Sequence, residues 1–496
     1  MTAIMTGERP VIRISGHGPD PDLREVVDDA DATVAAVGPT GVGAVEPLVA
    51  VSRGGETAFH ARCSPDHARA VVSALEEGDL AAADPDAVVD HDPGAARLPQ
   101  PPLAGLGTGE RAVLGACGWL RPASADDHEA AGGFVDPDPE TVMRVGDDLR
   151  GRGWGDWASD DPVSETWDRA SRADGETAVV VNAHGNVADT LLLASAPFEA
   201  LDGATALAGA VGADRVVVYA SSADERAVET AREAVAAYPN PGVGVEVVAG
   251  PPEYRAAEPT MALEAIEGNH RLEARLRPPG PDEVGLDGDP TLVHTARTLA
   301  HLAVALRQGD LPGTRTVTVT GDVDAPATVE LPETGTLREA VDAVAVDGGF
   351  KAACVGGRFG GVTGDLGAGL DPETLAGADL GTEGTIEVLG EGQCVVEFVG
   401  KRARFAAEEN CGRCVPCREG TTQLADQLRA VYGGEYDPGG IEELGRVMDT
   451  SSICRFGVDA GRPARTAVAE FDAEFAAHAD GRCPAGSCRD TLEAPT

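Results

Sequence analysis

Lysine is almost missing from this sequence. Lys351 and Lys401 are the only lysines among 496 residues, so nearly all of the 39 basic residues are Arg. Asp and Glu together number 83, and the formal net charge is −44. A surface this acidic repels phosphate, which excludes non-specific binding of nucleic acid or of an anionic membrane as a main activity. The composition, with aromatic residues at only 4%, is typical of proteins that stay soluble in high salt, as in halophiles.

Long apolar runs and an export signal are missing as well. No stretch approaches the roughly 18 apolar residues of a membrane-spanning helix, so direct membrane insertion is not expected. The first thirty residues contain Arg, Glu and Asp without an apolar core. This pattern predicts no secretory signal and a cytoplasmic location. Hydrophobic residues still make up 42% of the chain, so the charge does not imply disorder.

The N-terminal part predicts a mixed α/β unit. At roughly 150 residues per domain, the length suggests about three domains. Residues 1–24 have no clear periodicity and are expected to form a flexible arm. Residues 32–37 and 47–53 predict short strands, and 65–78 predict a helix with apolar residues at helical spacing. Residues 83–106 are rich in Pro, Asp and Ala and are expected to form a linker.

The central part predicts a parallel sheet. Residues 177–183 and 214–221 are continuous apolar runs bounded by turn residues, which suits strands that are buried on both faces, and a further run over 244–250 predicts another strand. A helix is predicted over residues 224–238, between the second and third runs. This β-α-β order indicates a doubly wound α/β domain.

The C-terminal part predicts two further units. Residues 314–323 and 327–332 alternate β-branched residues on either side of a turn, as in a hairpin, and a helix over 336–345 and a strand over 384–390 follow. This order indicates a small α+β unit of β-grasp type. Residues 392–480 read as helices joined by tight turns.

Three closely spaced cysteines carry the sharpest chemical signal. Cys411, Cys414 and Cys417 stand at C-x2-C-x2-C spacing, and Cys454 follows at a distance. In a chain with no export signal, such clustering favours a metal site over disulfides. Three thiolates at this spacing and a fourth from a distant loop are typical of an Fe–S cluster. Zinc, which more often takes paired C-x2-C motifs, and redox-active thiols are the alternatives.

The other six cysteines have no such spacing. Four of them are expected to be buried small hydrophobic residues: Cys63, Cys117, Cys354 and Cys394. The remaining two, Cys483 and Cys488, belong to the segment CPAGSC near the C-terminus. That pair could be a fragment of a second metal site, a surface dithiol or an evolutionary remnant.

The cysteine segment also carries a resemblance. NCGRCVPCREGT (410–421), Cys454 and the preceding α+β unit resemble the NADH-binding flavoprotein subunit of respiratory complex I, a module that also occurs in NAD-linked hydrogenases and formate dehydrogenases. The resemblance can be followed over roughly residues 105–480. It implies that Cys411, Cys414, Cys417 and Cys454 are the four ligands of one 4Fe–4S cluster.

The resemblance further implies a domain order. It places a thioredoxin-like domain and a linker in residues 1–100, an FMN- and NADH-type α/β domain in 101–308 and a soluble-ligand-binding β-grasp (SLBB) domain in 309–391. A helical 4Fe–4S domain in 392–480 and a tail in 481–496 follow. In the N-terminal unit, Pro39 and Gly43 stand where hydrogenase-type members carry cluster cysteines, so a 2Fe–2S cluster is not expected there.

The flavin motifs are kept only in part. The family loop G-R-G-G-A-G-F-P-T-G, which cradles FMN and stacks NADH, resembles GRGWGDWASD (151–160) in this chain. Trp154 replaces a glycine, Asp156 stands where the family has a second glycine, and Trp157 takes the place of Phe. A Trp side chain there would block close approach of a phosphate to the backbone, and Asp156 would repel it.

Three further motifs are similarly altered. N-A-D-E becomes NAHG (182–185), G-E-E-T becomes AEPT (257–260), and N-V-E-T becomes TART (295–298). The resemblance implies the following candidates for flavin contact: Gly151, Arg152, Gly153, Gly155, Asn182, Glu258, Thr260 and Thr295.

Three functional hypotheses follow. In the first, the protein passes electrons from NADH through FMN and a 4Fe–4S cluster to an acceptor. In the second, it is an electron-transfer or assembly subunit that keeps the cluster and has lost NADH and FMN. In the third, the cysteines form a zinc-bound knot in an interaction protein. No acid–base pair or nucleophile is predicted. The first two hypotheses imply a hetero-oligomer with other redox subunits or a ferredoxin-like acceptor.

A single substitution tests the ligand assignment. Cys414→Ser removes one of the four predicted thiolates, so the purified protein is expected to lose most of its iron and its Fe–S chromophore. Iron analysis and the visible absorbance spectrum measure this. An unaltered spectrum and iron content would refute the assignment of Cys414.

Overall fold

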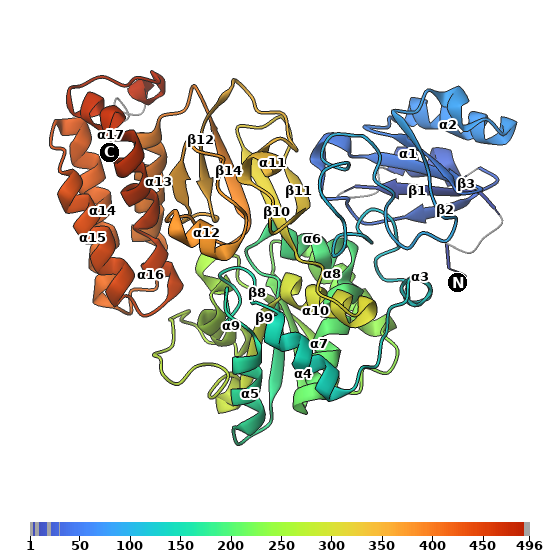
Figure 1. The fold of residues 1–496 in the computed structure, drawn as a ribbon, viewed down its shortest axis with the longest axis horizontal. Helices are drawn as coiled ribbons and strands as arrows, with labels where there is room; N and C mark the ends of the chain where they lie inside the picture. The colour runs from blue at the N-terminus through green and yellow to red at the C-terminus, as the bar shows by residue number, and fades with distance from the viewer. Residues whose placement is uncertain (1–2, 5–8, 17–20, 29, 491–496) are drawn as a thin grey trace.

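The computed structural model describes residues 3–4, 9–16, 21–28 and 30–490. Within them the chain folds as a mixed α/β protein with three sheets and a C-terminal helical region (Figure 1). The coarse fold class predicted from the sequence is therefore confirmed.

The N-terminal sheet has the strand order β2-β1-β3-β4-β5. Its strands are β1 (Val11–Ser15), β2 (Thr33–Ala36), β3 (Leu48–Arg53), β4 (Glu56–His60) and β5 (Ala87–Asp90). β1 and β2 are parallel, and the other neighbours are antiparallel. The side chains of α1 (Pro21–Asp28) and α2 (Pro65–Glu77) form one hydrophobic cluster with β1 and β3.

Two sequence predictions in this unit are wrong. Val11–Ser15 is not part of a flexible arm. It is a strand between β2 and β3, and all five of its residues are buried. Residues 1–2, 5–8 and 17–20 of the predicted arm lie outside the described residues. The alternation of apolar and polar residues in this strand covers only residues 12–15, which is too short to be recognised as periodicity. The predicted linker over 83–106 contains β5, which pairs with β4 along its length.

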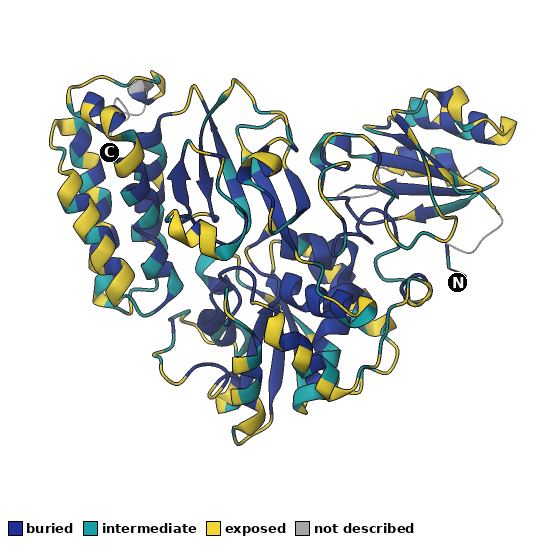
Figure 2. Cartoon of the chain, viewed as in Figure 1, coloured by how far each residue is buried: buried dark blue, intermediate teal, exposed yellow. Residues whose placement is uncertain are grey.

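The central sheet has the order β8-β7-β6-β9 and is parallel throughout. Its strands are β6 (Ala178–Asn182), β7 (Arg215–Ser221), β8 (Gly244–Gly250) and β9 (Thr291–Thr295). The three predicted strands and the predicted helix, α8 (Glu225–Ala237), are confirmed. β6 is buried along its whole length, which explains its continuous apolar sequence (Figure 2).

Helices surround this sheet. They are α4 (Pro139–Asp148), α5 (Ser164–Arg172), α6 (Val187–Ser195), α7 (Pro197–Val211), α9 (Pro259–Ile266) and α10 (Ala296–Gln308), and the short α3 (Ala125–Ala130) precedes them. No single described helix is long and apolar enough to span a membrane. α6 and α7 meet such a criterion only when counted together, and they meet at a bend of 97°.

The third sheet has the order β11-β10-β14-β12-β13. Its strands are β10 (Thr314–Gly321), β11 (Ala327–Pro332), β12 (Phe350–Val355), β13 (Gly361–Thr363) and β14 (Thr385–Gly390). The predicted hairpin is confirmed as the antiparallel pair β10–β11. The predicted helix exists but is shorter, as α11 (Leu337–Val341), and α12 (Pro372–Gly377) precedes β14.

The C-terminal region is helical, as predicted. It contains α13 (Val395–Glu409), α14 (Val415–Ala430), α15 (Pro438–Ser451), α16 (Arg455–Asp459) and α17 (Arg462–Ala479). Val468 and Phe475 of α17 are buried, and the outer faces of α14 and α15 are exposed (Figure 2).

The contact between α7 and α10 gives a stability prediction. A Cβ added to Gly203 of α7 would lie 1.9 Å from the Leu299 carbonyl oxygen of α10, so Gly203→Ala forces the two helices apart. We expect a loss of roughly 1–3 kcal/mol in the free energy of unfolding, seen as a lower thermal midpoint.

Gly209, in the same helix, is the matched control. No atom lies within 4 Å of a Cβ added there, so Gly209→Ala is expected to stabilise the helix by about 0.5–1 kcal/mol. Equal effects of the two substitutions would contradict the assigned packing.

Candidate functional site

The candidate site lies at the carboxyl ends of the parallel strands, where open α/β sheets bind ligands. Asn182 ends β6 and Thr295 ends β9, and these two strands are neighbours. The glycine-rich loop 151–156 crosses this edge. The segment that contains Glu258 begins α9 beside it. The sheet thus brings the predicted flavin-contact residues together from four segments of the chain.

Side chains of the sheet edge hold the loop. Asn182 Nδ2 donates to the carbonyl oxygens of Gly155 and Ala257, both at 2.9 Å. Thr295 Oγ1 donates to the Arg152 carbonyl oxygen at 2.8 Å. The polar groups of Asn182 and Thr295 are therefore engaged by the protein backbone, and both residues are buried.

Asp156 occupies the amino-terminal turn of α10. Its carboxylate accepts hydrogen bonds from the Thr295 backbone N–H at 3.1 Å, from Thr298 Oγ1 at 2.7 Å and from His294 Nδ1 at 3.0 Å. Burial alone would raise the pKa of Asp156, but His294 and these hydrogen bonds hold the pKa below its ordinary value. A helix amino terminus is an anion site, and here the anion is a side chain of the chain itself.

The His294 ring is fixed in the orientation that this contact requires. Trp167 Nε1 donates to His294 Nε2 at 2.8 Å, so the Nδ1 atom carries the proton that is donated to Asp156. All three side chains are buried. The sequence motifs did not reveal this chain of contacts, because Trp167 lies on α5, outside them.

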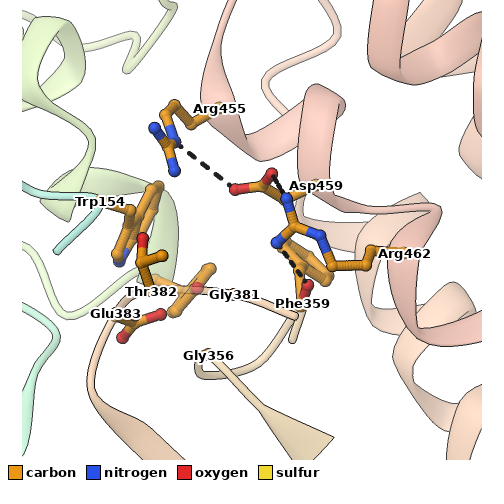
Figure 3. Close-up of a pocket in the computed structure, with 10 residues that line it drawn as sticks. Trp154, Gly356, Phe359, Gly381, Thr382, Glu383, Arg455, Asp459 and Arg462 are labelled. Atoms are coloured by element: carbon orange, nitrogen blue, oxygen red, sulfur yellow. Dashed lines mark hydrogen bonds and ion pairs between the residues drawn. The ribbon is translucent and has the colours of Figure 1, made fainter. Parts of the chain in front are cut away.

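Trp154 fills the space above the loop. Its ring stacks on Tyr254, with ring centroids 4.6 Å apart and the planes at 21°. Figure 3 shows Trp154 facing Thr382, Glu383 and the charged side chains of α16 and α17. The cavity that remains among these residues is about 10 Å³. This is far below the several hundred Å³ of a typical cofactor pocket.

Glu258 and Thr260 stabilise the start of α9. Glu258 Oε2 accepts hydrogen bonds from the backbone N–H groups of Thr260 and Met261 at 2.9 and 3.1 Å. Arg277 Nη2 donates to the other carboxylate oxygen at 3.0 Å. Glu258 is fully buried, and its position as the helix N-cap explains its presence without a ligand.

The four predicted cluster cysteines gather beside this site. Cys417 Sγ lies close enough to Cys411 and Cys414 to interact with both electrostatically, and Cys454 Sγ interacts with Cys411 and Cys417. Cys417 and Cys454 are buried, and Cys411 and Cys414 are half-buried. Gly412, in the left-handed region at φ 75°, turns the loop between the first two.

Aromatic rings connect the cysteines to the sheet edge. Tyr254, which stacks on Trp154, packs edge-on against Phe456 at 6.3 Å and against Phe359 at 5.7 Å between ring centroids. Phe456 is two residues after Cys454. The ring contacts therefore run from Trp154 in the glycine-rich loop, through Tyr254, to Phe456 in the helix that follows Cys454.

A buried polar network lines the other side of the cavity. Arg297 forms an ion pair with Asp189 at 3.0 Å and donates to the Glu383 carbonyl oxygen at 2.8 Å. Burial raises the pKa of the Glu383 carboxyl to about 7, although Arg297 opposes the shift. Arg297 thus stands where the family motif has Glu, and its charge is balanced within the chain.

An open groove of about 470 Å³ adjoins Tyr254. Its ionisable lining includes Asp224, Glu253 and Glu409 beside Arg358. His184, which replaces a family carboxylate, borders the groove but is buried, and its Nε2 donates to the Pro251 carbonyl oxygen at 2.7 Å. The groove is acidic, so it disfavours the phosphates of a dinucleotide.

Comparison with known proteins identifies two regions. Residues 397–478 match the family model described as the NADH-ubiquinone oxidoreductase-F iron-sulfur binding region. Residues 149–304 match the model described as the Nuo51 FMN-binding domain.

Relatives that cover about 70% of this chain agree with these matches. The F subunit of the NADH-quinone oxidoreductase of Streptomyces coelicolor is 30% identical over 384 residues, which cover 69% of this chain and 84% of that protein. The F 2 subunit of the NADH-quinone oxidoreductase of Rhizobium meliloti is 29% identical over 407 residues, covering 72% and 95%. The crystal structure of an NAD+-reducing [NiFe]-hydrogenase in the air-oxidized state superposes with a TM-score of 0.65 at 22% identity, covering 100% of this chain and 90% of that one, which shows a shared fold.

The pKa of Glu383 predicts a pH dependence of stability. The folded-state pKa of about 7 lies above the ordinary value of 4.5. Between these values the unfolded chain loses the proton while the folded chain keeps it, so stability falls as the pH rises from about 4.5 to about 7. Glu383→Gln removes this loss. Relative to the wild type, the variant is expected to gain on the order of 3 kcal/mol across that window.

Thermal midpoints of both proteins across the pH range measure this difference. Glu391→Gln, at an exposed position, is the control and is expected to follow the wild type at every pH. Parallel curves for the wild type and Glu383→Gln would show that the carboxyl ionises normally in the folded protein.

Proposed function

The chain belongs to the family of NADH-quinone oxidoreductase F subunits, with an FMN-binding domain and an iron–sulfur binding region, and we propose that it passes electrons within a multisubunit redox complex. The observation that carries the proposal is the convergence of four cysteines, from two separate loops, inside the matched iron–sulfur region. An electron carrier of this kind needs a buried redox group close to a surface, where a partner can reach it.

We assign the 4Fe–4S ligands to Cys411, Cys414, Cys417 and Cys454. The donor set suits the group, because four thiolates are the usual ligands of such a cluster. The Gly457 backbone N–H donates to the Cys454 carbonyl oxygen at 3.1 Å, which fixes Cys454 at the start of α16. Cys414 is the N-cap of α14, so it lies at the positive end of the helix dipole. The cluster would supply one-electron transfer, while these residues hold it and exclude water.

The flavin cradle does not fit FMN in this conformation. The Trp154 ring lies on Tyr254 and leaves a cavity of about 10 Å³ above the loop. The Asp156 carboxylate occupies the amino terminus of α10, the position that would suit a phosphate. We therefore derive no step through a flavin. The function that the geometry supports best is a cluster-bearing electron-transfer subunit that keeps the fold of the FMN domain.

The second candidate is oxidation of NADH through FMN. The match of residues 149–304 to the FMN-binding domain favours it. It requires Trp154 and Asp156 to leave the positions described above, at the cost of the Trp154–Tyr254 stack and the Asp156 hydrogen bonds. Gly151, Arg152, Gly153, Gly155, Asn182, Glu258, Thr260 and Thr295 would then be the flavin-contact residues.

The finer domain assignments are part of the proposal. A thioredoxin-like unit in residues 1–100 is supported by the parallel pair β1–β2 followed by the antiparallel pair β3–β4. A soluble-ligand-binding β-grasp unit in 309–391 is supported by the hairpin β10–β11 with β14 parallel to β10. The partners we propose are other redox subunits or a ferredoxin-like electron acceptor in the cytoplasm.

Reduction of the purified protein distinguishes the two candidates. The full chain is purified without oxygen in high salt and examined by absorbance and EPR with dithionite or with NADH. We expect a cluster signal with dithionite, none with NADH, and no extractable flavin. A flavin band that NADH bleaches would overturn the cluster-only function, and absence of iron would overturn both candidates.

Removal of the two blocking side chains should reopen the cradle. Trp154→Gly combined with Asp156→Gly restores the family residues, removes the Asp156 carboxylate from the first turn of α10 and clears the face of Tyr254. We expect the affinity for FMN to rise at least about tenfold, equivalent to about 1.4 kcal/mol. Quenching of flavin fluorescence on titration measures this.

Trp157→Phe is the matched control in the same loop. It also introduces the family residue, but it leaves Trp154 and Asp156 in place, so its affinity for FMN should equal that of the wild type. Equal affinity of the wild type and the double variant, with the double variant folded by circular dichroism, would show that these side chains do not block the cradle.

A further inference from the structure

A second group of sulfur ligands lies at the opposite end of α13 from the 4Fe–4S cysteines. Cys394 is the N-cap of α13, His478 lies in the last turn of α17, and Cys483 and Cys488 follow in the C-terminal segment. Figure 1 shows this segment at the end of the helical region away from α16. α13 has 15 residues, so the two groups are separated by about 22 Å along the helix.

The four ligand atoms are close enough to share one ion. His478 Nε2 lies 3.2 Å from Cys394 Sγ and 3.6 Å from Cys488 Sγ. All four ligand atoms lie within 4.8 Å of one another. Among the described residues, this is the one group of three or more His, Cys, Asp or Glu side chains whose ligand atoms lie that close together. With Zn–S and Zn–N bonds of about 2.3 and 2.0 Å, a tetrahedral zinc site has ligand–ligand edges of roughly 3.5–3.8 Å.

The histidine is held in the tautomer that a metal requires. His478 Nδ1 donates to the Glu474 carbonyl oxygen at 2.7 Å. A carbonyl oxygen can only accept, so the ring proton is on Nδ1 and the Nε2 lone pair faces the three sulfurs. A hydrogen bond from the second ring nitrogen to a backbone carbonyl is the usual support of a metal-bound histidine.

Backbone hydrogen bonds support the group. The Gly486 N–H donates to the Cys483 carbonyl oxygen at 3.2 Å and turns the chain between Cys483 and Cys488. The Glu397 N–H donates to Cys394 Sγ at 3.3 Å, in the first turn of α13. Such donors stabilise thiolates that are bound to a metal. Cys394, His478 and Cys488 are buried, and Cys483 is half-buried, so the group is largely closed to solvent.

We propose that Cys394, His478, Cys483 and Cys488 bind one structural Zn²⁺ ion. Three sulfurs and one imidazole form a closed Cys₃His set, which is typical of a structural zinc site and leaves no open position for catalysis. The thiols release their protons to solvent as the ion binds, and no electron is transferred. The inference is independent of the proposed electron-transfer function, because it concerns a redox-inactive ion at the other end of α13.

The ion would join three separate parts of the chain. Cys394 follows β14, His478 ends α17, and Cys483 and Cys488 belong to the segment that leaves the helical region. Binding of one ion to all of them fixes the C-terminal segment to the junction between the third sheet and the helices. Metal-binding free energy is then part of the stability of the folded chain.

Metal analysis of the full chain tests the proposal. The protein is purified without oxygen, and zinc and iron are measured by mass spectrometry. We expect about one zinc per chain besides the iron. Zinc-edge X-ray absorption of the wild type should give three sulfur ligands and one nitrogen ligand. This measurement needs no variant, so a failure of a variant to fold does not affect it.

Paired variants separate the two sites. Cys488→Ser is expected to lose at least about 90% of the zinc, to keep its iron and to lower the thermal midpoint. Cys414→Ser is expected to lose the iron and to keep the zinc. Replacement of zinc by Co²⁺ in the wild type should give the visible absorption bands of a tetrahedral thiolate site, and these bands should be absent from Cys488→Ser.

Three outcomes would overturn the proposal. The first is wild-type protein that contains iron and no zinc. The second is a disulfide between Cys483 and Cys488 in the protein purified without oxygen. The third is zinc that disappears in Cys414→Ser and persists in Cys488→Ser, because the zinc would then occupy the first cysteine group. Loss of NADH or dithionite reactivity affects none of these readouts, so the two proposals fail separately.

Discussion

The first turn of α10 holds two carboxylates: that of Asp189, which accepts the Arg297 backbone N–H at 2.9 Å, and that of Asp156. The hydrogen bonds of the Asp156 carboxylate with Thr295 and Thr298 fix the glycine-rich loop against the end of β9. The same loop then directs Trp154 onto Tyr254. A buried carboxylate with these partners is costly to displace, because each hydrogen bond would be lost in a medium of low dielectric constant. The interaction therefore decides what the sheet edge can bind.

The aromatic contacts extend this constraint to the helical region. Tyr254 has Trp154 on one face and packs edge-on against Phe456, next to Cys454. The space between the sheet edge and the cysteines is thus filled by side chains that pack on one another. A chain that keeps an FMN-type fold and fills its cradle in this way retains the scaffold for positioning the cysteines. The fold and the cofactor content of a family member are therefore separate questions.

Local patterns predicted most of the secondary structure. β6 and β7 were evident because each is a continuous apolar run that its own residues determine. β5 was missed, because its four residues lie in a Pro- and Asp-rich stretch and become a strand only through pairing with β4. β1 was mistaken for an arm, because its alternation of apolar and polar residues covers only residues 12–15, and Arg13 and Ser15 become buried only through packing of the folded chain.

The residues of the candidate sites were also predictable only in part. The C-x2-C-x2-C spacing was readable since its ligands are close in sequence, and the substitutions at 154 and 156 were visible against the family motif. The direction of the Asp156 side chain was not, because its partners His294 and Thr298 are more than 130 residues away. The set at Cys394 was hidden for the same reason, since Cys394 and His478 are 84 residues apart. The packing of α13 on α17 brings Cys394 and His478 together.

α13 has a sulfur-rich site at each of its ends, and each site includes partly exposed sulfurs. Cys483 is half-buried at one end, and Cys411 and Cys414 are half-buried at the other. An oxidant can therefore reach thiols at both ends and convert them to forms that no longer bind a metal. Damage at Cys483 would detach the C-terminal segment, and damage at Cys411 or Cys414 would remove a cluster ligand, so oxidative stress acts on the attachment of the tail and on the redox activity through different thiols.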